Sequence, residues 1–159
     1  MATRIADSES PQLRLATAED ASTIADCVAL AYSPWVARIG RKPWPMLQDY
    51  AAVVREALVT VAEVAGKIVG VLVLSITAEG LLIENVAVHP SWKGRGVGRA
   101  LLQHAESEAR RLGFRNLYLY TNELMVENIA LYLRYGYREY ERRQEQGFSR
   151  VFMRKAVPQ

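Results

Sequence analysis

Three glycines at alternate positions of the stretch KGRGVGR (93–99) constrain this chain more than any other feature. An apolar run precedes them at 81–88, and apolar residues recur at helical spacing after them over 97–113. Glycine lets backbone N–H groups approach a ligand because it has no Cβ, and the first turn of a helix has unpaired N–H groups. With basic residues interleaved, the segment predicts a strand–loop–helix unit that binds an anion such as a phosphate.

The glycine spacing excludes two common phosphate-binding motifs. A dinucleotide fingerprint, GxGxxG, needs a third glycine where the chain has Arg99 or Leu101, depending on the starting glycine. A Walker A loop starting at Gly94 also needs a glycine at position 99. A plain turn between strand and helix is the alternative interpretation, but such a turn needs neither three glycines nor flanking cations.

The remaining periodicities predict an α+β chain with a mixed sheet covered by helices. The expected strands are 11–16, 59–64, 67–76, 81–88, 116–121 and a closing hairpin of 137–143 with 148–154. The expected helices are about 19–32, 46–58, 97–113 and 124–135. Segment 33–45, with three prolines and two tryptophans, is expected to be a loop, and the polar residues 1–10 a flexible segment before a single domain over 11–159.

Composition narrows the function classes. The net charge of +3 fits an anionic small molecule as well as a nucleic acid. Glutamates interleave with the arginines of the closing hairpin, which favours a solvated strand face over a nucleic-acid surface. His89 and His104 have no partners at metal-ligand spacing, so no metal is expected. With no secretory signal and no apolar run of membrane-spanning length, a cytoplasmic protein with neither membrane nor nucleic-acid partner is expected.

The glycine stretch and a second motif together resemble the GNAT superfamily of acetyl-CoA-dependent N-acetyltransferases. AVHPSWKGRGVGRALL is similar to the family signature [Q/R]-x-x-G-x-[G/A] after a strand ending in V-x-P, with Lys93 at the first position. ENIALYLRYGY is similar to the family's Y-x-x-x-G-F motif, with Tyr132 as its tyrosine and Tyr137 in place of the phenylalanine. With the first strand and the last strand, RVFMRK, the resemblance covers about residues 11–156.

The resemblance implies a central, mostly antiparallel sheet of six or seven strands, splayed between 81–88 and 116–121 and flanked by about four helices. Acetyl-CoA as cosubstrate would lie in the split, with its diphosphate on the glycine loop and its pantetheine arm along the free edge of 86–88. The family's usual asparagine seven residues before the tyrosine is Met125 here, and Asn128 follows one turn later. The implied cofactor-binding residues are Val86, Ala87, Val88, Lys93, Gly94, Arg95, Gly96, Val97, Gly98, Arg99 and Asn128.

The resemblance also implies a reaction, in which a primary amine of an amino acid, small amine or peptide attacks the thioester directly in a ternary complex. Tyr132 takes the family's acid position, whereas without the resemblance it would be assigned to core packing. Glu84 is the candidate base; by strand alternation it is expected to share a face with Val86 and Val88. A half-exposed glutamate paired with an arginine, with water as the base, is the alternative.

The acceptor is expected at loop 33–45, where Trp35 and Trp44 offer apolar walls. The alternative is that these tryptophans cap the core. A homodimer is compatible with this scheme. The alternative function is a catalytically silent acyl-CoA-binding or sensing module, and a nucleic-acid-binding domain is the less favoured rival.

Overall fold

The computed structural model describes residues 10–159 and contains one seven-stranded sheet in the order β1-β2-β3-β4-β5-β7-β6. The predicted flexibility of residues 1–10 falls, apart from Ser10, outside the described residues. The strands are β1 (Gln12–Leu15), β2 (Leu58–Val64), β3 (Lys67–Thr77), β4 (Gly80–Val88), β5 (Asn116–Asn122), β6 (Arg138–Glu145) and β7 (Phe148–Ala156). The helices are α1 (Ala21–Ile39), α2 (Tyr50–Glu56), α3 (Val97–Leu112) and α4 (Val126–Arg134), with short 3₁₀ turns between elements. The predicted α+β class and mostly antiparallel, seven-stranded sheet are therefore confirmed.

The predicted closing hairpin is present, and β2 and β3, which were predicted as successive strands, form a second hairpin. Ala65-Gly66 joins β2 to β3, and Gln146-Gly147 joins β6 to β7; all four residues have positive φ. Two consecutive left-handed residues make the turn that matches the twist of paired strands. These turns fix the register of β2 with β3 and of β6 with β7.

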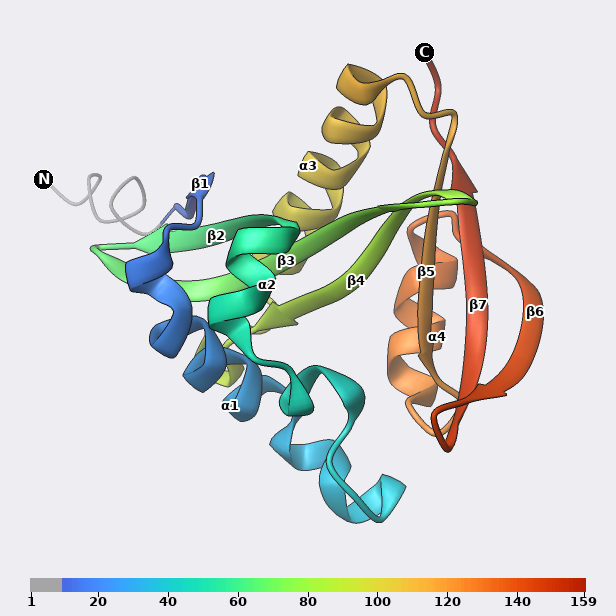
Figure 1. Cartoon of the computed structure of the whole chain (residues 1–159), viewed down its shortest axis with the longest axis horizontal. Helices are drawn as coiled ribbons and strands as arrows, with labels where there is room; N and C mark the ends of the chain where they lie inside the picture. The colour runs from blue at the N-terminus through green and yellow to red at the C-terminus, as the bar shows by residue number, and fades with distance from the viewer. Residues whose placement is uncertain (1–9) are drawn as a thin grey trace, which may run out of the picture.

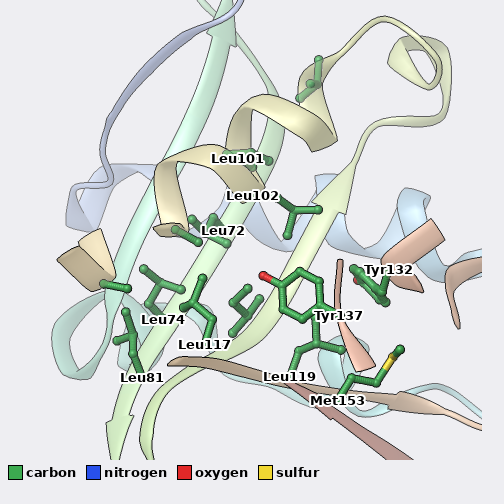
Figure 2. Close-up of a cluster of buried hydrophobic side chains, with 14 of the residues drawn as sticks. Leu72, Leu74, Leu81, Leu101, Leu102, Leu117, Leu119, Tyr132, Tyr137 and Met153 are labelled. Atoms are coloured by element: carbon green, nitrogen blue, oxygen red, sulfur yellow. The ribbon is translucent and has the colours of Figure 1, made fainter. Parts of the chain in front are cut away.

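Helices cover both faces of the sheet (Figure 1). On one face, α1 and α2 pack on β2–β4 around a cluster that contains Ile24, Val28 and Val71. On the other face, α3 and α4 contribute to a second cluster, whose leucines surround the ring of Tyr137 while Tyr132 lies at its edge (Figure 2). Within residues 10–159, no helix is long and apolar enough to cross a membrane.

Helix α1 is longer than predicted. It was expected to end before Pro34, but it runs to Ile39 with Pro34 inside it. Proline removes the N–H that would bond to the carbonyl of Leu30. The Ser33 hydroxyl donates to that carbonyl instead, at 3.2 Å. The first half of the predicted loop 33–45 is therefore helical, and Trp35 lies on α1.

Helix α2 is shorter than the predicted helix 46–58. Trp44–Leu47 forms a 3₁₀ turn that starts after Pro43, and α2 begins only at Tyr50. Asp49 caps α2, because its side chain accepts a hydrogen bond from the Ala51 N–H at 3.1 Å. The 3₁₀ turn places Trp44 and its flanking prolines beside the middle of the sheet.

The sheet splits between β4 and β5, its one parallel pair. Only three positions are paired, from Leu81 with Leu117 to Ile83 with Leu119. Beyond them the two strands diverge, toward α1 and α4 (Figure 1). The predicted splay between 81–88 and 116–121 is present, and it leaves one edge of β4 without a strand partner.

Close packing holds α3 against the sheet next to this split. A Cβ at Gly70 of β3 would lie 2.7 Å from Cγ1 of Val97 and 3.0 Å from Cδ1 of Leu101. Glycine at this position therefore lets the first turns of α3 approach β3. The predicted apolar stripe of this helix is buried at Val97, Leu101 and Ala105.

Candidate active site

A large hollow opens between α1, α3, α4 and the free edge of β4. The glycine loop forms one end of it. Gly94 and Gly96 have φ of +76° and +86°, and a Cβ on either would meet no atom within 4 Å. The first backbone amide of α3 that donates a hydrogen bond to a helix carbonyl is that of Ala100, which donates to Gly96 O at 3.0 Å. The amides of the first turn before it are unpaired, as a helix start requires, and an anion can accept from them.

The basic residues of the loop do not all face this hollow. Lys93 and Arg99 line it, together with Gly94, Gly96, Val97 and Gly98. The guanidinium of Arg95 lies over the ring of Trp92, with its carbon 4.8 Å from the ring centroid. The side chain of Arg95 therefore packs on the loop, and Arg95 is not among the residues that line the hollow.

The free edge of β4 presents backbone groups to the same hollow. The N–H of His89 donates to Val69 O at 2.8 Å, so positions 89 and 69 form a hydrogen-bonded pair of the β3–β4 ladder. In an antiparallel ladder such pairs alternate with pairs whose N–H and C=O point away. The backbone groups of Val86 and Val88 therefore point toward the split, and those of Ala87 toward β3. Val86, Ala87 and Val88 all line the hollow.

A second, smaller hollow lies on the other side of the split, between β4, β5, β7 and the turn at Trp44. Four residues line both hollows: Tyr32, Val86, Asn128 and Tyr132. They come from α1, β4 and α4, the elements that border the split. The two hollows therefore meet at the side chain of Tyr132.

Tyr132 is largely enclosed at this junction. Its side chain is 8% exposed, and its ring packs edge-on against Tyr137 with the centroids 5.9 Å apart. Burial raises the pKa of its phenol above the ordinary value of 10.0. One turn earlier, the Asn128 side chain donates to the Met125 sulfur at 3.6 Å. The Tyr132 phenol thus stays protonated at neutral pH, and its ring packs in the core, as the alternative interpretation proposed.

Glu84 does not share a face with Val86 and Val88, so that prediction is wrong. The β3–β4 register passes from Val73–Asn85 to Leu74–Ile83 and leaves Glu84 as the extra residue of a β-bulge. Glu84 and Asn85 consequently both face the α1–α2 side, where they line the space beside Tyr50. Glu84 still borders the smaller hollow.

Sequence reasoning missed a chain of hydrogen bonds behind this bulge. The Tyr32 hydroxyl donates to Asn85 Oδ1 at 2.8 Å, and Asn85 Nδ2 donates to the Tyr50 hydroxyl at 3.1 Å. Burial raises the pKa of both tyrosines. The chain fixes α1 and α2 to the bulge, and the polar pair Glu84-Asn85 inside the otherwise apolar run LLIENVAV was the available signal.

The structure places the two predicted acceptor residues in different hollows. Trp44 lines the smaller one, whereas Trp35 lines the larger one with the glycine loop. Arg38, one turn after Trp35, forms an ion pair with Glu127 of α4 at 2.7 Å. This contact joins the end of α1 to α4 across the split.

Arg150 on β7 also lines the smaller hollow, and sequence reasoning missed it. The arginines of the last two strands were expected on a solvated face, but Arg150 is only 6% exposed. Phe148 and Phe152 are buried at i−2 and i+2, and this alternation could have predicted an inward-facing arginine. Within residues 10–159 no group of three or more His, Cys, Asp or Glu is placed to hold a metal ion.

Solved structures of similar overall fold indicate the class to which this fold belongs. PaiA N-acetyltransferase from Thermoplasma acidophilum, solved with coenzyme A, has a TM-score of 0.80 at 17% identity, covering 92% of this chain and 99% of that one. The ribosomal-protein-S18-alanine N-acetyltransferase from Escherichia coli has a TM-score of 0.75 at 20% identity, covering 94% and 95%. At these identities the likeness concerns the fold alone.

The sequence gives the family. Residues 24–137 match the model of the acetyltransferase (GNAT) family, and the chain belongs to this family. It is 31% identical over 74 residues to the bS18-alanine N-acetyltransferase of E. coli K12, covering 46% of this chain and 50% of that protein. It is 35% identical over 79 residues to an IAA acetyltransferase of Azospirillum brasilense, covering 48% and 52%. The chain thus spans about half the length of these curated relatives.

Proposed function

We propose that this protein transfers the acetyl group of acetyl-CoA to a primary amine in a ternary complex, as a single N-acetyltransferase domain over residues 11–159. One observation carries the proposal: two hollows meet at Tyr32, Val86, Asn128 and Tyr132. One hollow has features that suit a phosphate-bearing cosubstrate, and the other is lined by aromatic and polar side chains. Direct transfer needs both reactants to approach one point from separate sites.

The larger hollow fits acetyl-CoA in its charge and backbone geometry. The amides of 94–99 would hold the diphosphate, with Lys93 and Arg99 as counter-charges. The space over Gly94 and Gly96 that a Cβ would fill supports a close backbone approach. The outward-facing groups of Val86 and Val88 would pair with the amides of the pantetheine arm, and Asn128 would contact the same arm. Trp35 then forms a wall of this hollow rather than of the acceptor site.

Acetyl-CoA supplies an activated thioester carbonyl at the junction. The N–H of Val86 points into the split and would stabilise the negative charge that develops on the carbonyl oxygen. Tyr132, neutral because its pKa is raised, would donate its proton to the departing sulfur.

The acceptor amine would enter through the smaller hollow, beside Trp44. It must lose a proton as it forms the new amide bond, and Glu84 at the bulge would take that proton through water. The curated relatives are named as acetyltransferases of an alanine of a ribosomal protein, of IAA and of streptothricin. A nitrogen acceptor agrees with the N-acetyltransferases among them.

A thiol-release assay tests the proposal, with acetyl-CoA and a panel of amino acids, small amines and short peptides. We expect free thiol to appear with at least one acceptor, and calorimetry to detect binding of CoA. Binding without thiol release for any amine would replace the proposal with a silent acyl-CoA-binding module. No binding at all would reject the assignment of the larger hollow.

A further inference from the structure

The smaller hollow contains a buried positive charge with an unused hydrogen-bond donor. The Arg150 side chain is 6% exposed, and its Nη1 contacts Glu145 Oε2 at 2.9 Å. Its Nη2 is also buried, and no residue among 10–159 accepts a hydrogen bond from it. A buried donor without a partner costs free energy, more so when it carries charge. Such a group is expected where a ligand completes its hydrogen bonding.

The protein neutralises this charge only in part. Glu145 is shared, because its Oε1 also contacts Arg143 Nε at 2.9 Å, and Arg143 lies directly opposite Arg150 in the β6–β7 register. The other neighbours are aromatic: the guanidinium carbon lies 4.3 Å from the centroid of the Tyr120 ring. Aromatic faces stabilise a cation but do not accept its in-plane hydrogen bonds. An anion in the smaller hollow would supply the missing acceptor.

The arginines of the segment at the end of α1 are engaged elsewhere. Arg38 pairs with Glu127. Arg41 lies over the Phe148 ring at 3.6 Å and donates to Gln146 O at 3.0 Å. Arg41 thereby attaches this segment to the β6–β7 turn at the edge of the hollow, and Arg150 is the arginine that lines it.

We propose that the acceptor is a small free amino acid whose carboxylate binds Nη2 of Arg150. The inference rests on the proposed function, because it assigns the smaller hollow to the acceptor. With the carboxylate at Arg150 and apolar walls at Trp44 and Phe148, the amine is left to face the junction at Tyr132. A peptide amino terminus and an amino acid amide carry only a neutral carbonyl oxygen beside the amine, so they give Nη2 a hydrogen bond without the charge. An amine without a carbonyl leaves Nη2 unpaired. A charge-assisted hydrogen bond between a guanidinium and a carboxylate is among the strongest hydrogen bonds in proteins. A neutral competitor cannot form it.

Matched acceptors test this inference in the wild-type protein. Leucine and phenylalanine are compared with their amides and with the amines that lack the carboxyl group, by thiol release from acetyl-CoA. We expect kcat/KM to be roughly 10- to 100-fold higher for the free acids than for the amines that lack the carboxyl group, the range that an unsatisfied charged donor implies, with the amides between the two. The difference should lie mainly in KM, because Arg150 binds the acceptor away from the reacting atoms.

Two variants separate binding from folding. In Arg150→Gln the ratio of acid to amide should fall to about one, while the affinity for CoA, measured by calorimetry, stays unchanged. Arg150→Lys keeps the charge and should retain part of the preference. If Arg150→Gln does not fold, the wild-type ratios and competitive inhibition by 3-phenylpropionate against the acceptor decide the question alone.

The results also distinguish a failure of this inference from a failure of the proposed acetyltransferase function. Equal turnover of acids and amides by the wild-type protein would overturn the carboxylate site and leave the acetyltransferase intact. A preference for acids over amides that persists in Arg150→Gln would likewise show that Arg150 does not bind the carboxylate. Absence of thiol release with every acceptor would overturn the proposed function itself.

Discussion

Tyr132 combines two properties that an acid for a departing thiolate needs, a neutral phenol and a place at the junction of two hollows. Because burial raises its pKa above 10.0, the phenol stays protonated as the pH rises through that value. Deprotonation of Tyr132 therefore gives no falling limb below about pH 10, and the rate should rise with pH as the acceptor amine loses its proton.

Replacing Tyr132 by phenylalanine removes the proton and keeps the ring. We expect kcat to fall on the order of 10²-fold, with the KM for acetyl-CoA nearly unchanged. Steady-state thiol release between pH 6 and pH 10 measures both effects. An unchanged kcat in Tyr132→Phe would remove this residue from the chemistry and leave it a packing role.

Single residues also show where prediction from sequence stopped. The glycine loop and the Tyr132 motif were found because their spacing is local in the chain. The orientation of Glu84 was not predicted, because a bulge adds one residue to β4 and reverses the alternation of side chains between the two faces of the sheet beyond it. The burial of Arg150 depends on Glu145 and Tyr120, which come from two neighbouring strands.

At the scale of elements, the contact between α3 and β3 positions the glycine loop. Gly70→Ala would bring a Cβ to 2.7 Å from Val97, whose short branched side chain has little freedom to move. We expect a loss of about 1–3 kcal/mol in the free energy of unfolding, measured with urea. The affinity for CoA should fall as well, because the first turn of α3 must shift.

Gly98→Ala is the matched control for stability. Its Cβ would make an ordinary contact of 3.5 Å with Val88, and its φ is not positive. Stability should be unchanged or slightly higher, since alanine favours a helix over glycine. A loss as large as that in Gly70→Ala would contradict the close-packing argument.

The 3₁₀ turn Ala18–Asp20, which leads into α1, depends on a carboxylate. Asp20 accepts from the Thr17 N–H at 2.7 Å and from Arg14 at 2.8 Å, and these bonds, chiefly that of Arg14, hold its pKa well below the ordinary 3.8. A lowered pKa stabilises the fold above pH 3.8, and this contribution is lost as the pH falls below that value. Asp20→Asn keeps an acceptor oxygen but removes the charge that pairs with Arg14, and it should cost up to about 1 kcal/mol at pH 7. The difference in the free energy of unfolding between variant and wild type, measured by urea titration, should shrink toward pH 2. A difference that stays constant with pH would contradict this role of Asp20.

Element boundaries were predicted where the signal is local and missed where another side chain decides. The two hairpin turns and α3 follow from glycines and apolar spacing. The end of α1 was missed because Ser33 satisfies the carbonyl that Pro34 leaves free. A proline within a helix pattern predicts an end only when nothing nearby replaces the lost bond.

At the scale of the whole molecule, the sheet has two parts, β1–β4 and β5–β7, joined by three paired positions and a shared core. The Arg38–Glu127 pair crosses the split, but both side chains are about half exposed, so it contributes at most about 1 kcal/mol. A ligand that fills the larger hollow would contact both parts and stabilise them together.

We expect CoA at 100 times its Kd to stabilise the protein by about 2.7 kcal/mol. For a chain of this size that corresponds to a rise in Tm of roughly 5–10 °C, measured by differential scanning fluorimetry. Cysteamine, which carries the thiol without the phosphates, should give no shift at the same concentration. An equal shift with cysteamine would argue against the glycine loop as the main binding element.

The unpartnered edge of β4 has a consequence for the timing of hydrogen–deuterium exchange. The amides of Val86 and Val88 lack a strand to bond with, whereas the amide of Ala87 between them points to β3. In the free protein, labelling should therefore be fast, slow and fast along three successive residues. Once a ligand lies along this edge, all three should become slow, and the protected amides would mark the track of its arm.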